Sequence, residues 1–294
     1  MKQTILGAIC LSLAASIWGG MYVVSKYVLD FIPPLTLVWL RFIIAFVVLY
    51  FILKIAEKKQ KKKVVIRKKD WLLFAWIGFI GYFISITCQF IGTKLSDAHT
   101  GSLVTSATPA FMVIFAALIL KEKLTARRLL STIIATIGVI IVIGWDIEIG
   151  SYFIGTIILV GAAITWALLS IYVKIASIQF SSLVITTYAI FFSLFFITPF
   201  MICELQTTSI GTVNTYVILG VLYLGIVSTA GAFFLWNKGL ELLDASIGSL
   251  FFFFQPIVGS LLGWLLLNET LNSNFFIGGI LIICSVLITT FEKK

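Results

Sequence analysis

The sequence predicts an all-α membrane protein of ten transmembrane helices arranged as two inverted five-helix repeats. Three observations support this prediction: an apolar composition, a one-sided distribution of basic residues, and a pattern that recurs at a fixed offset. Of the 294 residues, 61% are hydrophobic and 11% are charged, whereas a soluble domain has about 25% charged residues. The composition therefore indicates an integral membrane protein.

The apolar runs have the length of membrane spans. A helix rises about 1.5 Å per residue and the hydrocarbon core is about 30 Å thick, so a span needs about 20 mostly apolar residues. Dividing the chain at charges, prolines and polar clusters predicts ten spans: about 4 to 27, 35 to 54, 71 to 93, 98 to 120, 127 to 144, 152 to 173, 183 to 203, 213 to 237, 245 to 267 and 274 to 291. The first run is too long for a signal peptide, so we expect it to remain as a helix.

The basic residues predict the orientation of these spans. With ten spans, the side that carries both termini holds eighteen Lys and Arg residues and the other side holds only Lys26 and Lys94. Basic residues favour the cytoplasm, so we expect a multi-pass protein of the cell membrane with both termini cytoplasmic. The basic loop from Lys58 to Lys69 is expected mainly to set the orientation of the spans in the membrane. Contact with anionic lipids is the second expectation, and binding of nucleic acid is not expected.

A sequence pattern recurs at an offset of 147 residues. The stretch "TPAFMVIFAALILKEKL" is echoed by "QPIVGSLLGWLLLNETL", and the shared positions are Asp97 and Asp244, Ala98 and Ala245, Ser102 and Ser249, Pro109 and Pro256, Glu122 and Glu269, and Leu124 and Leu271. Trp18 with Trp166 and Lys26 with Lys174 match at 148. The chain thus divides into repeats 1–147 and 148–294. Because each has five spans, the second enters the membrane from the opposite side.

An inverted repeat favours a carrier that works by alternating access around a midplane site. A channel is one alternative, and a membrane-embedded enzyme is the other. An enzyme would need a metal or nucleophile cluster, which one histidine and four separated cysteines do not supply, so we expect neither catalysis nor a metal or cofactor. The sequence holds no GxxxxGK[ST] loop, so ATP is not expected to drive the protein directly.

Four stretches resemble the EamA-type repeats of the drug/metabolite transporter superfamily: "SIWGGMYVVSK", "PPLTLVWLRFIIA", "TPAFMVIFAALILKEKLTARRLL" and "QPIVGSLLGWLLLNETL". The resemblance covers nearly the whole chain. It implies two inverted EamA-like repeats, a central cavity lined by spans 1, 3, 4, 6, 8 and 9, and export or exchange of small metabolites such as amino acids. The chain departs from the usual pattern at two points: Tyr188 or Ala189 stands where Arg41 would repeat, and Gln255 replaces an acidic residue before Pro256.

The midplane prolines are the first candidates for a functional role. Pro109 and Pro256 each remove one helix hydrogen bond and are expected to free a carbonyl one turn earlier, at Thr105 and Phe252. Within the membrane, such a carbonyl needs a hydrogen-bond donor from the protein or from water in a cavity. The prolines therefore either bend their helices or mark the edges of a binding site.

A mixed aromatic and polar lining is predicted at the same depth. It suits a small amino-acid-like or aromatic molecule held by ring contacts and a few hydrogen bonds. Packing within the bundle and lipid contact are the alternative for any single aromatic residue. The candidate substrate-binding residues are Trp18, Tyr22, Tyr82, Gln89, Ser102, Ser106, Trp166, Ser170, Tyr223, Thr229, Phe252 and Gln255.

Charged residues within or near the spans are few. Arg41 is expected to snorkel to the membrane interface; attraction of an anionic substrate is the alternative. Asp97 and Asp244 are predicted helix N-caps, and Glu122 and Glu269 are predicted anchors at helix ends. His99 could sense protons, but all twelve acidic residues fall in loops or near helix ends, which disfavours a proton relay across the spans.

Overall fold

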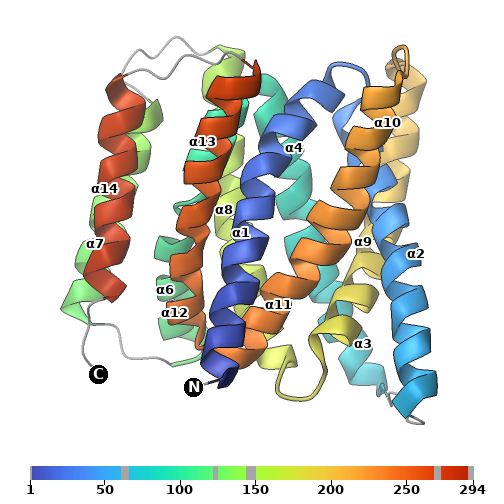
Figure 1. Ribbon diagram of the computed structural model, residues 1–294, viewed down its shortest axis with the longest axis horizontal. Helices are drawn as coiled ribbons and strands as arrows, with labels where there is room; N and C mark the ends of the chain where they lie inside the picture. Colours follow the sequence, from blue (N-terminus) through green and yellow to red (C-terminus); the bar gives the residue numbers. More distant parts are fainter. Residues whose placement is uncertain (1, 61–65, 122–124, 144–149, 268–272, 291–294) are drawn as a thin grey trace.

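The computed structural model is a bundle of helices that run between its two ends in alternating directions (Figure 1). It describes residues 2–60, 66–121, 125–143, 150–267 and 273–290. This part of the chain is all-helical, without strands. The first half contains α1 (Lys2–Leu29), α2 (Pro34–Gln60), α3 (Lys68–Ile77), η1 (Gly78–Ser85), α4 (Ile86–Leu95), α5 (Ala98–Thr105), α6 (Thr108–Ile119) and α7 (Ala126–Ile143).

The second half has the same succession of long and interrupted helices. It contains α8 (Ser151–Ala176), α9 (Ser182–Thr207), α10 (Thr215–Leu222), η2 (Tyr223–Gly231), α11 (Ala232–Leu242), α12 (Ala245–Gly248), η3 (Ser249–Phe253), α13 (Phe254–Leu267) and α14 (Ser273–Thr290). The start of α1 and the end of α14 lie at the same end of the molecule (Figure 1).

Seven helical segments among the described residues are long and apolar enough to cross a membrane. They are Gln3–Leu29, Pro34–Lys59, Lys68–Leu95, Thr100–Ile119, Ser151–Ala176, Ser182–Thr207 and Thr215–Leu242. Large apolar side chains such as Phe51, Leu72 and Phe195 are mostly exposed on the outside of the bundle. A soluble monomer rarely exposes so much apolar surface, so these faces fit contact with lipid.

Two helices form the centre of the bundle. α1 packs against α11 and α13, while α8 packs against α4 and α6. α2 packs along α9, and α7 packs against α14 at one edge of the molecule, apart from the central helices (Figure 1). Side chains of α1, α8, α11 and η1 therefore meet in the middle, where the main hydrophobic core lies.

Two helices widen to a π-helix near their middle, at η1 and at η2. In η2 the Thr229 hydroxyl donates to the carbonyl oxygen of Leu224, five residues earlier, at 2.6 Å. In η1 the Ser85 hydroxyl leaves its own helix and donates to the carbonyl of Ala162 on α8, at 2.8 Å. π-Helical turns are uncommon and occur frequently at functional sites.

Pro109 breaks its helix rather than bending it. α5 ends at Thr105 and α6 begins at Thr108, so Pro109 stands in the first turn of a new helix, where a missing N–H costs little. The carbonyl of Thr105 accepts the Thr108 hydroxyl at 2.6 Å. The Thr105 carbonyl, which Pro109 was expected to free from its helix bond, therefore finds a partner within the protein. Pro256 likewise lies in the first turn of α13, directly after the 3-10 helix η3.

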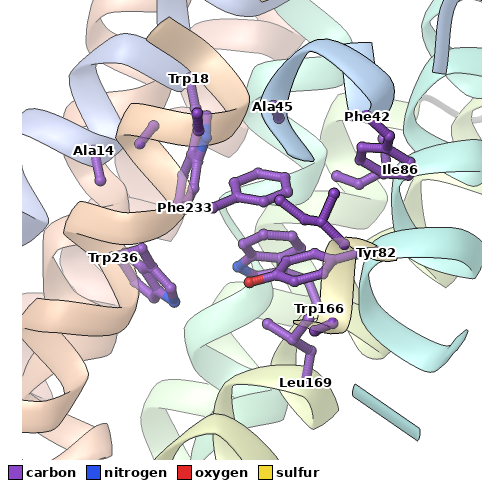
Figure 2. Close-up of a cluster of buried hydrophobic side chains, with 14 of the residues drawn as sticks. Ala14, Trp18, Phe42, Ala45, Tyr82, Ile86, Trp166, Leu169, Phe233 and Trp236 are labelled. Atoms are coloured by element: carbon purple, nitrogen blue, oxygen red, sulfur yellow. The ribbon is translucent and has the colours of Figure 1, made fainter. Parts of the chain in front are cut away.

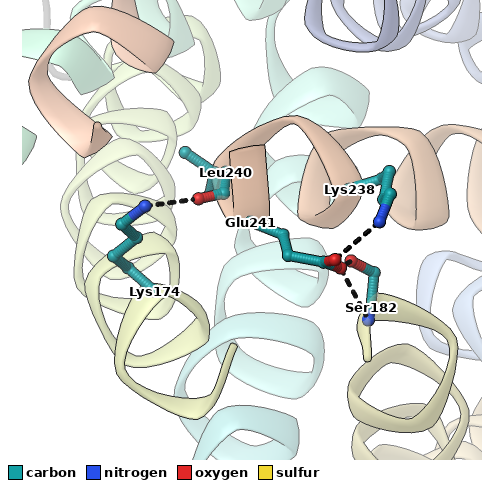
Figure 3. Close-up of polar contacts among 5 residues, drawn as sticks. All are labelled: Lys174, Ser182, Lys238, Leu240 and Glu241. Carbon is teal, nitrogen blue, oxygen red and sulfur yellow. Dashed lines mark hydrogen bonds and ion pairs between the residues drawn. The ribbon is translucent and has the colours of Figure 1, made fainter. Parts of the chain in front are cut away.

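Two lysines bind helix C-termini in matching ways. Lys26 Nζ donates to the carbonyl oxygens of Thr93 (3.2 Å) and Ser96 (2.6 Å). Lys174 Nζ donates to those of Leu240 and Leu243, both at 2.8 Å (Figure 3 shows the Leu240 bond). A cation at a helix C-terminus is favourable because it meets unpaired carbonyls and the negative end of the dipole.

The prediction that Asp97 is an N-cap is confirmed, because its Oδ1 accepts the backbone N–H of Thr100 at 2.8 Å. Glu122 and Glu269 lie outside the described residues, as does most of the basic loop that follows Gln60. The side chain of His99 also lies outside the described part, so its expected role stays a prediction.

Candidate functional site

Trp18 is the centre of a buried aromatic cluster. Its ring meets Trp166 edge-on, with centroids 5.1 Å apart, and meets Trp236 at 5.3 Å and Phe252 at 5.9 Å. Figure 2 shows these tryptophans around Phe233, whose ring lies parallel to that of Tyr82 at 4.6 Å. Aromatic side chains from both halves of the chain thus meet at one place.

A small cavity lies within this cluster. Its volume is about 10 Å³, enough for about one water molecule. Six of the twelve predicted substrate-binding residues line it, together with three residues outside that list of twelve. The predicted ones are Trp18, Tyr22, Gln89, Trp166, Phe252 and Gln255, and the others are Met21, Ile86 and Phe233.

The hydroxyl of Thr105 joins three helices at the wall of the cavity. It donates to the carbonyl of Gly101 within α5 at 2.7 Å and lies 2.8 Å from the hydroxyl of Tyr22 on α1. Gln255 Nε2, on α13, donates to the same oxygen at 2.7 Å. Thr105 therefore fixes two lining side chains and leaves the other end of the Gln255 amide for another partner.

Two buried polar atoms in the cavity wall have no hydrogen-bond partner among the described residues. They are the donor Nε1 of Trp166 and the acceptor Oε1 of Gln255, on side chains that are 3% and 2% exposed. Buried polar groups are nearly always paired, since an unmade hydrogen bond costs about 1–3 kcal/mol. A donor and an acceptor left unpaired in one cavity wall fit a site for a polar small molecule.

Three other predicted residues are fixed by hydrogen bonds next to the cavity. The Tyr82 hydroxyl accepts from Asn237 Nδ2 at 3.0 Å, and the Ser170 hydroxyl accepts from Trp236 Nε1 at 3.3 Å. The Tyr223 hydroxyl donates to the carbonyl of Ile17 at 2.9 Å. These three residues join the helices around the cavity and are not among its lining residues.

Two more predicted serines, Ser102 in α5 and Ser106 directly after it, also lie outside the cavity lining. The Ser106 hydroxyl donates to the carbonyl of Leu103 in α5 at 2.6 Å. Ser102 is fully buried against α13: a Cβ added to Gly259 would lie 2.6 Å from its Oγ. Both serines therefore take part in the packing of α5 and not in the cavity lining.

Arg41 does not snorkel to a membrane interface, so that expectation is wrong. Its side chain is fully buried. Arg41 Nε donates to the Thr229 hydroxyl at 2.7 Å and Nη2 to the Ser228 hydroxyl at 3.3 Å. The π-helix η2 supplies both hydroxyls, and inward-facing polar partners of this kind are what a buried guanidinium needs within an apolar span.

The residues that sequence reasoning missed include a stripe on α11. Phe233, Trp236 and Asn237 are spaced i, i+3 and i+4, which places them on one helix face. All three are at most 1% exposed. The predicted span 213 to 237 contains this spacing. Because most residues of that span are apolar, the three positions did not stand out from their neighbours.

The fold and the cavity define a polytopic helical membrane protein with a buried, mainly aromatic central site. The EamA-like transporter family matches this sequence twice, over residues 5–144 and over residues 153–291. The chain belongs to that family.

Two curated relatives match over most of their length. The uncharacterized transporter YetK of Bacillus subtilis is 27% identical over 298 residues, covering 100% of this chain and 89% of the relative. The probable amino-acid metabolite efflux pump of Escherichia coli is 26% identical over 292 residues, covering 96% of this chain and 94% of the relative. One solved crystal structure shares the fold, with a TM-score of 0.71, 20% identity, and coverage of 97% of this chain and 96% of the other.

Proposed function

We propose that this protein is a secondary transporter that exports or exchanges a small amino-acid-like or aromatic metabolite by alternating access. The observation that carries the proposal is the central cavity, with its unpaired Trp166 Nε1 and Gln255 Oε1. At about 10 Å³ the cavity is too small for any metabolite, so binding requires the helices to move apart. The name of the E. coli relative, an amino-acid metabolite efflux pump, supports the substrate class.

The architecture that we propose is ten transmembrane helices in two inverted repeats, residues 1–147 and 148–294. Two matches to one family support the duplication. The packing supports it as well, because α1 contacts α11 and α13 as α8 contacts α4 and α6. Lys26 binds residues 93 and 96, and Lys174 binds the residues 147 positions further along, 240 and 243.

Alternating access is supported by a difference between the two ends of the α2–α9 pair. Glu204 and Glu57 are 147 residues apart, and they lie in the last turns of α9 and α2. Glu204 Oε2 accepts the backbone N–H of Thr36, at the start of α2, at 2.7 Å. The corresponding start of α9, at Ser182, is bound instead by Glu241 of α11 (Figure 3).

A cavity of about 250 Å³ lies at that second end, lined by Glu57, Ser182 and Glu241 among others. The α2–α9 pair is therefore closed by a carboxylate at one end and hollowed at the other. We propose that the opposite conformation exchanges these arrangements: Glu57 caps α9, and Glu204 releases α2. An inverted repeat can form both arrangements because each half carries a glutamate at the equivalent position, Glu57 in one and Glu204 in the other.

We further propose that the protein lies in the cell membrane with both termini cytoplasmic. Lys58 and Lys59 end α2, and Lys68 and Lys69 begin α3; all four side chains are exposed. They lie at the end of the molecule where α1 starts (Figure 1). That end suits the cytoplasmic face and contact with anionic headgroups.

Counterflow in proteoliposomes tests the function. Purified protein is reconstituted with an unlabelled compound inside, and uptake of its labelled form is followed for amino acids, nucleosides and sugar phosphates, with and without a pH gradient. We expect saturable counterflow of an amino acid, absent from empty liposomes and reduced in Gln255→Ala. If no compound moves although the protein is folded, the proposal fails. Flux that neither saturates nor accelerates with substrate on the far side would identify a channel.

A further inference from the structure

We infer that Arg41 binds the carboxylate of the transported molecule, so that the substrate class is a small organic acid with an apolar or aromatic body. This inference rests on the proposed function. It starts from the depth of Arg41, whose side chain is 0% exposed within the span Pro34–Lys59. Ionisable residues at such positions are costly to bury and commonly serve transport.

The charge of Arg41 has no ionic partner among the described residues. Its polar contacts are the hydroxyls of Thr229 and Ser228 and, at 3.5 Å from Nη1, the sulfur of Met21. A guanidinium has five N–H donors, so these contacts leave part of its capacity unused. A buried charge without a counter-ion is strongly unfavourable, and an anionic ligand would remove that cost.

Arg41 lies directly behind the cavity wall. Met21 and Phe233 line the cavity, and both contact the guanidinium: Met21 through its sulfur, and Phe233 with its ring centroid 5.8 Å from Cζ. Phe90 lies on the guanidinium as well, at 4.8 Å. Methionine is unbranched and flexible, so a rotation of Met21 would expose Nη1 to the cavity.

The rest of the cavity wall complements such an acid. The rings of Trp18, Trp166, Phe233 and Phe252 supply apolar and aromatic surface. Its lining residues include no acidic side chain within the described part of the chain. Arg41 touches this lining through Met21 and Phe233, so a positive charge stands directly behind the wall of the cavity. The ammonium group of an amino acid would be accepted by Gln255 Oε1 and the ring faces.

Binding of four related probes tests the inference. They are L-phenylalanine, L-phenylalaninamide, 3-phenylpropionate and 2-phenylethylamine, so that carboxylate and amine are removed separately. Purified protein in detergent is titrated with each, and the fluorescence of the tryptophans around the cavity is followed. We expect both acids to bind at least about tenfold more tightly than the amide and the amine, the size expected for a charge-assisted hydrogen bond.

Variants assign this preference to Arg41. Arg41→Gln is expected to weaken the binding of the two acids at least about tenfold and to leave the binding of the two non-acids nearly unchanged. Arg41→Lys keeps the charge without the planar fork and should retain part of the preference. Arg67→Gln, which removes an exposed guanidinium at the start of α3, is the matched control and should bind as the wild type does.

Three results would overturn the inference. The first is wild-type binding of the amide and the amine as tight as that of the acids, which decides the matter even if the variants do not fold. The second is equal weakening of all four probes in Arg41→Gln, which would make Arg41 a positioning residue for η2. In both cases counterflow of another substrate would leave the proposed function standing. The third is no binding of any probe together with no counterflow, and then both fail.

Discussion

Glu204, near the end of α9, caps the start of α2 through Thr36. One carboxylate oxygen accepts the backbone N–H of Thr36 at 2.7 Å and its hydroxyl at 2.8 Å, and the other accepts the N–H of Leu35 at 3.0 Å. A negative charge at a helix N-terminus is favourable because it satisfies unpaired donors and opposes the dipole. The two helices are thereby joined at one end, 168 residues apart in the sequence.

Glu204→Ala is expected to destabilise the protein by about 1–2 kcal/mol, since it leaves the donors of Leu35 and Thr36 without their side-chain acceptor. Thermal unfolding of the purified protein measures the effect. Thr36→Val is the graded control because it removes only the hydroxyl bond, and it should cost less than half as much. Equal unfolding midpoints for wild type and Glu204→Ala would mean that water replaces the carboxylate and that the cap contributes nothing.

The two central tryptophans should respond differently to the same substitution. Trp18 Nε1 donates to the carbonyl of Ser228 at 3.1 Å, whereas Trp166 Nε1 is buried without a partner among the described residues. Trp18→Phe loses ring volume and a hydrogen bond, but Trp166→Phe loses ring volume and an unsatisfied donor. We therefore expect Trp166→Phe to be more stable than Trp18→Phe by about 1–2 kcal/mol.

Transport separates the roles of the two residues further. If Trp166 Nε1 donates to the substrate, Trp166→Phe is the more stable of the two variants but loses affinity, seen as a raised half-saturation concentration in counterflow. Unfolding midpoints and counterflow are measured on the same preparations. An unchanged half-saturation concentration in Trp166→Phe would exclude its donor from substrate binding.

Gly19→Ala should separate α1 from α13. A Cβ at this position would lie 2.6 Å from the backbone oxygen of Gln255 and 2.9 Å from the backbone nitrogen of Gly259. Backbone atoms cannot yield as a flexible side chain can, so we expect a loss of about 1–3 kcal/mol. Gly161→Ala is the matched control, because a Cβ there meets nothing within 4 Å and alanine favours the helix. Similar unfolding midpoints for the two variants would contradict this close packing.

Much of the fold was predictable because membrane burial acts on every residue of a span. The predicted segment 35 to 54 lies inside the helix Pro34–Gln60, and 183 to 203 lies inside Ser182–Thr207. Apolar length alone could not reveal the π-helices η1 and η2. They depend on packing between helices, as when Ser85 donates to the carbonyl of Ala162.

The candidate site was predictable where a residue type was rare in the spans. Gln89 and Gln255 stood out as amides among apolar residues, and both line the cavity. Phe233 was hidden because phenylalanine occurs 26 times in this chain. The prediction for Arg41 was wrong because it used only the distance of Arg41 from the end of its span. The partners that hold the side chain inside the bundle, Ser228 and Thr229, come from a helix almost 190 residues away in the sequence.

Cross-linking tests whether the two ends of the α2–α9 pair close in turn. In a background without the four native cysteines, Cys10, Cys88, Cys203 and Cys284, one variant carries Leu35→Cys with Glu204→Cys. The other carries the positions 147 residues away from these, Ser182→Cys with Glu57→Cys. A short bifunctional thiol reagent that a reductant can cleave is applied to each in proteoliposomes.

We expect either cross-link to stop counterflow and the reductant to restore it, because a carrier must open and close both ends in each cycle. The first pair should react in the conformation described here, where Glu204 reaches Leu35, and the second in the opposite conformation. In a variant with all four substitutions, one cross-link should therefore exclude the other. Single-cysteine variants treated with the reagent control for chemical inactivation. Simultaneous cross-links at both ends, or counterflow that continues through them, would show that the ends do not alternate.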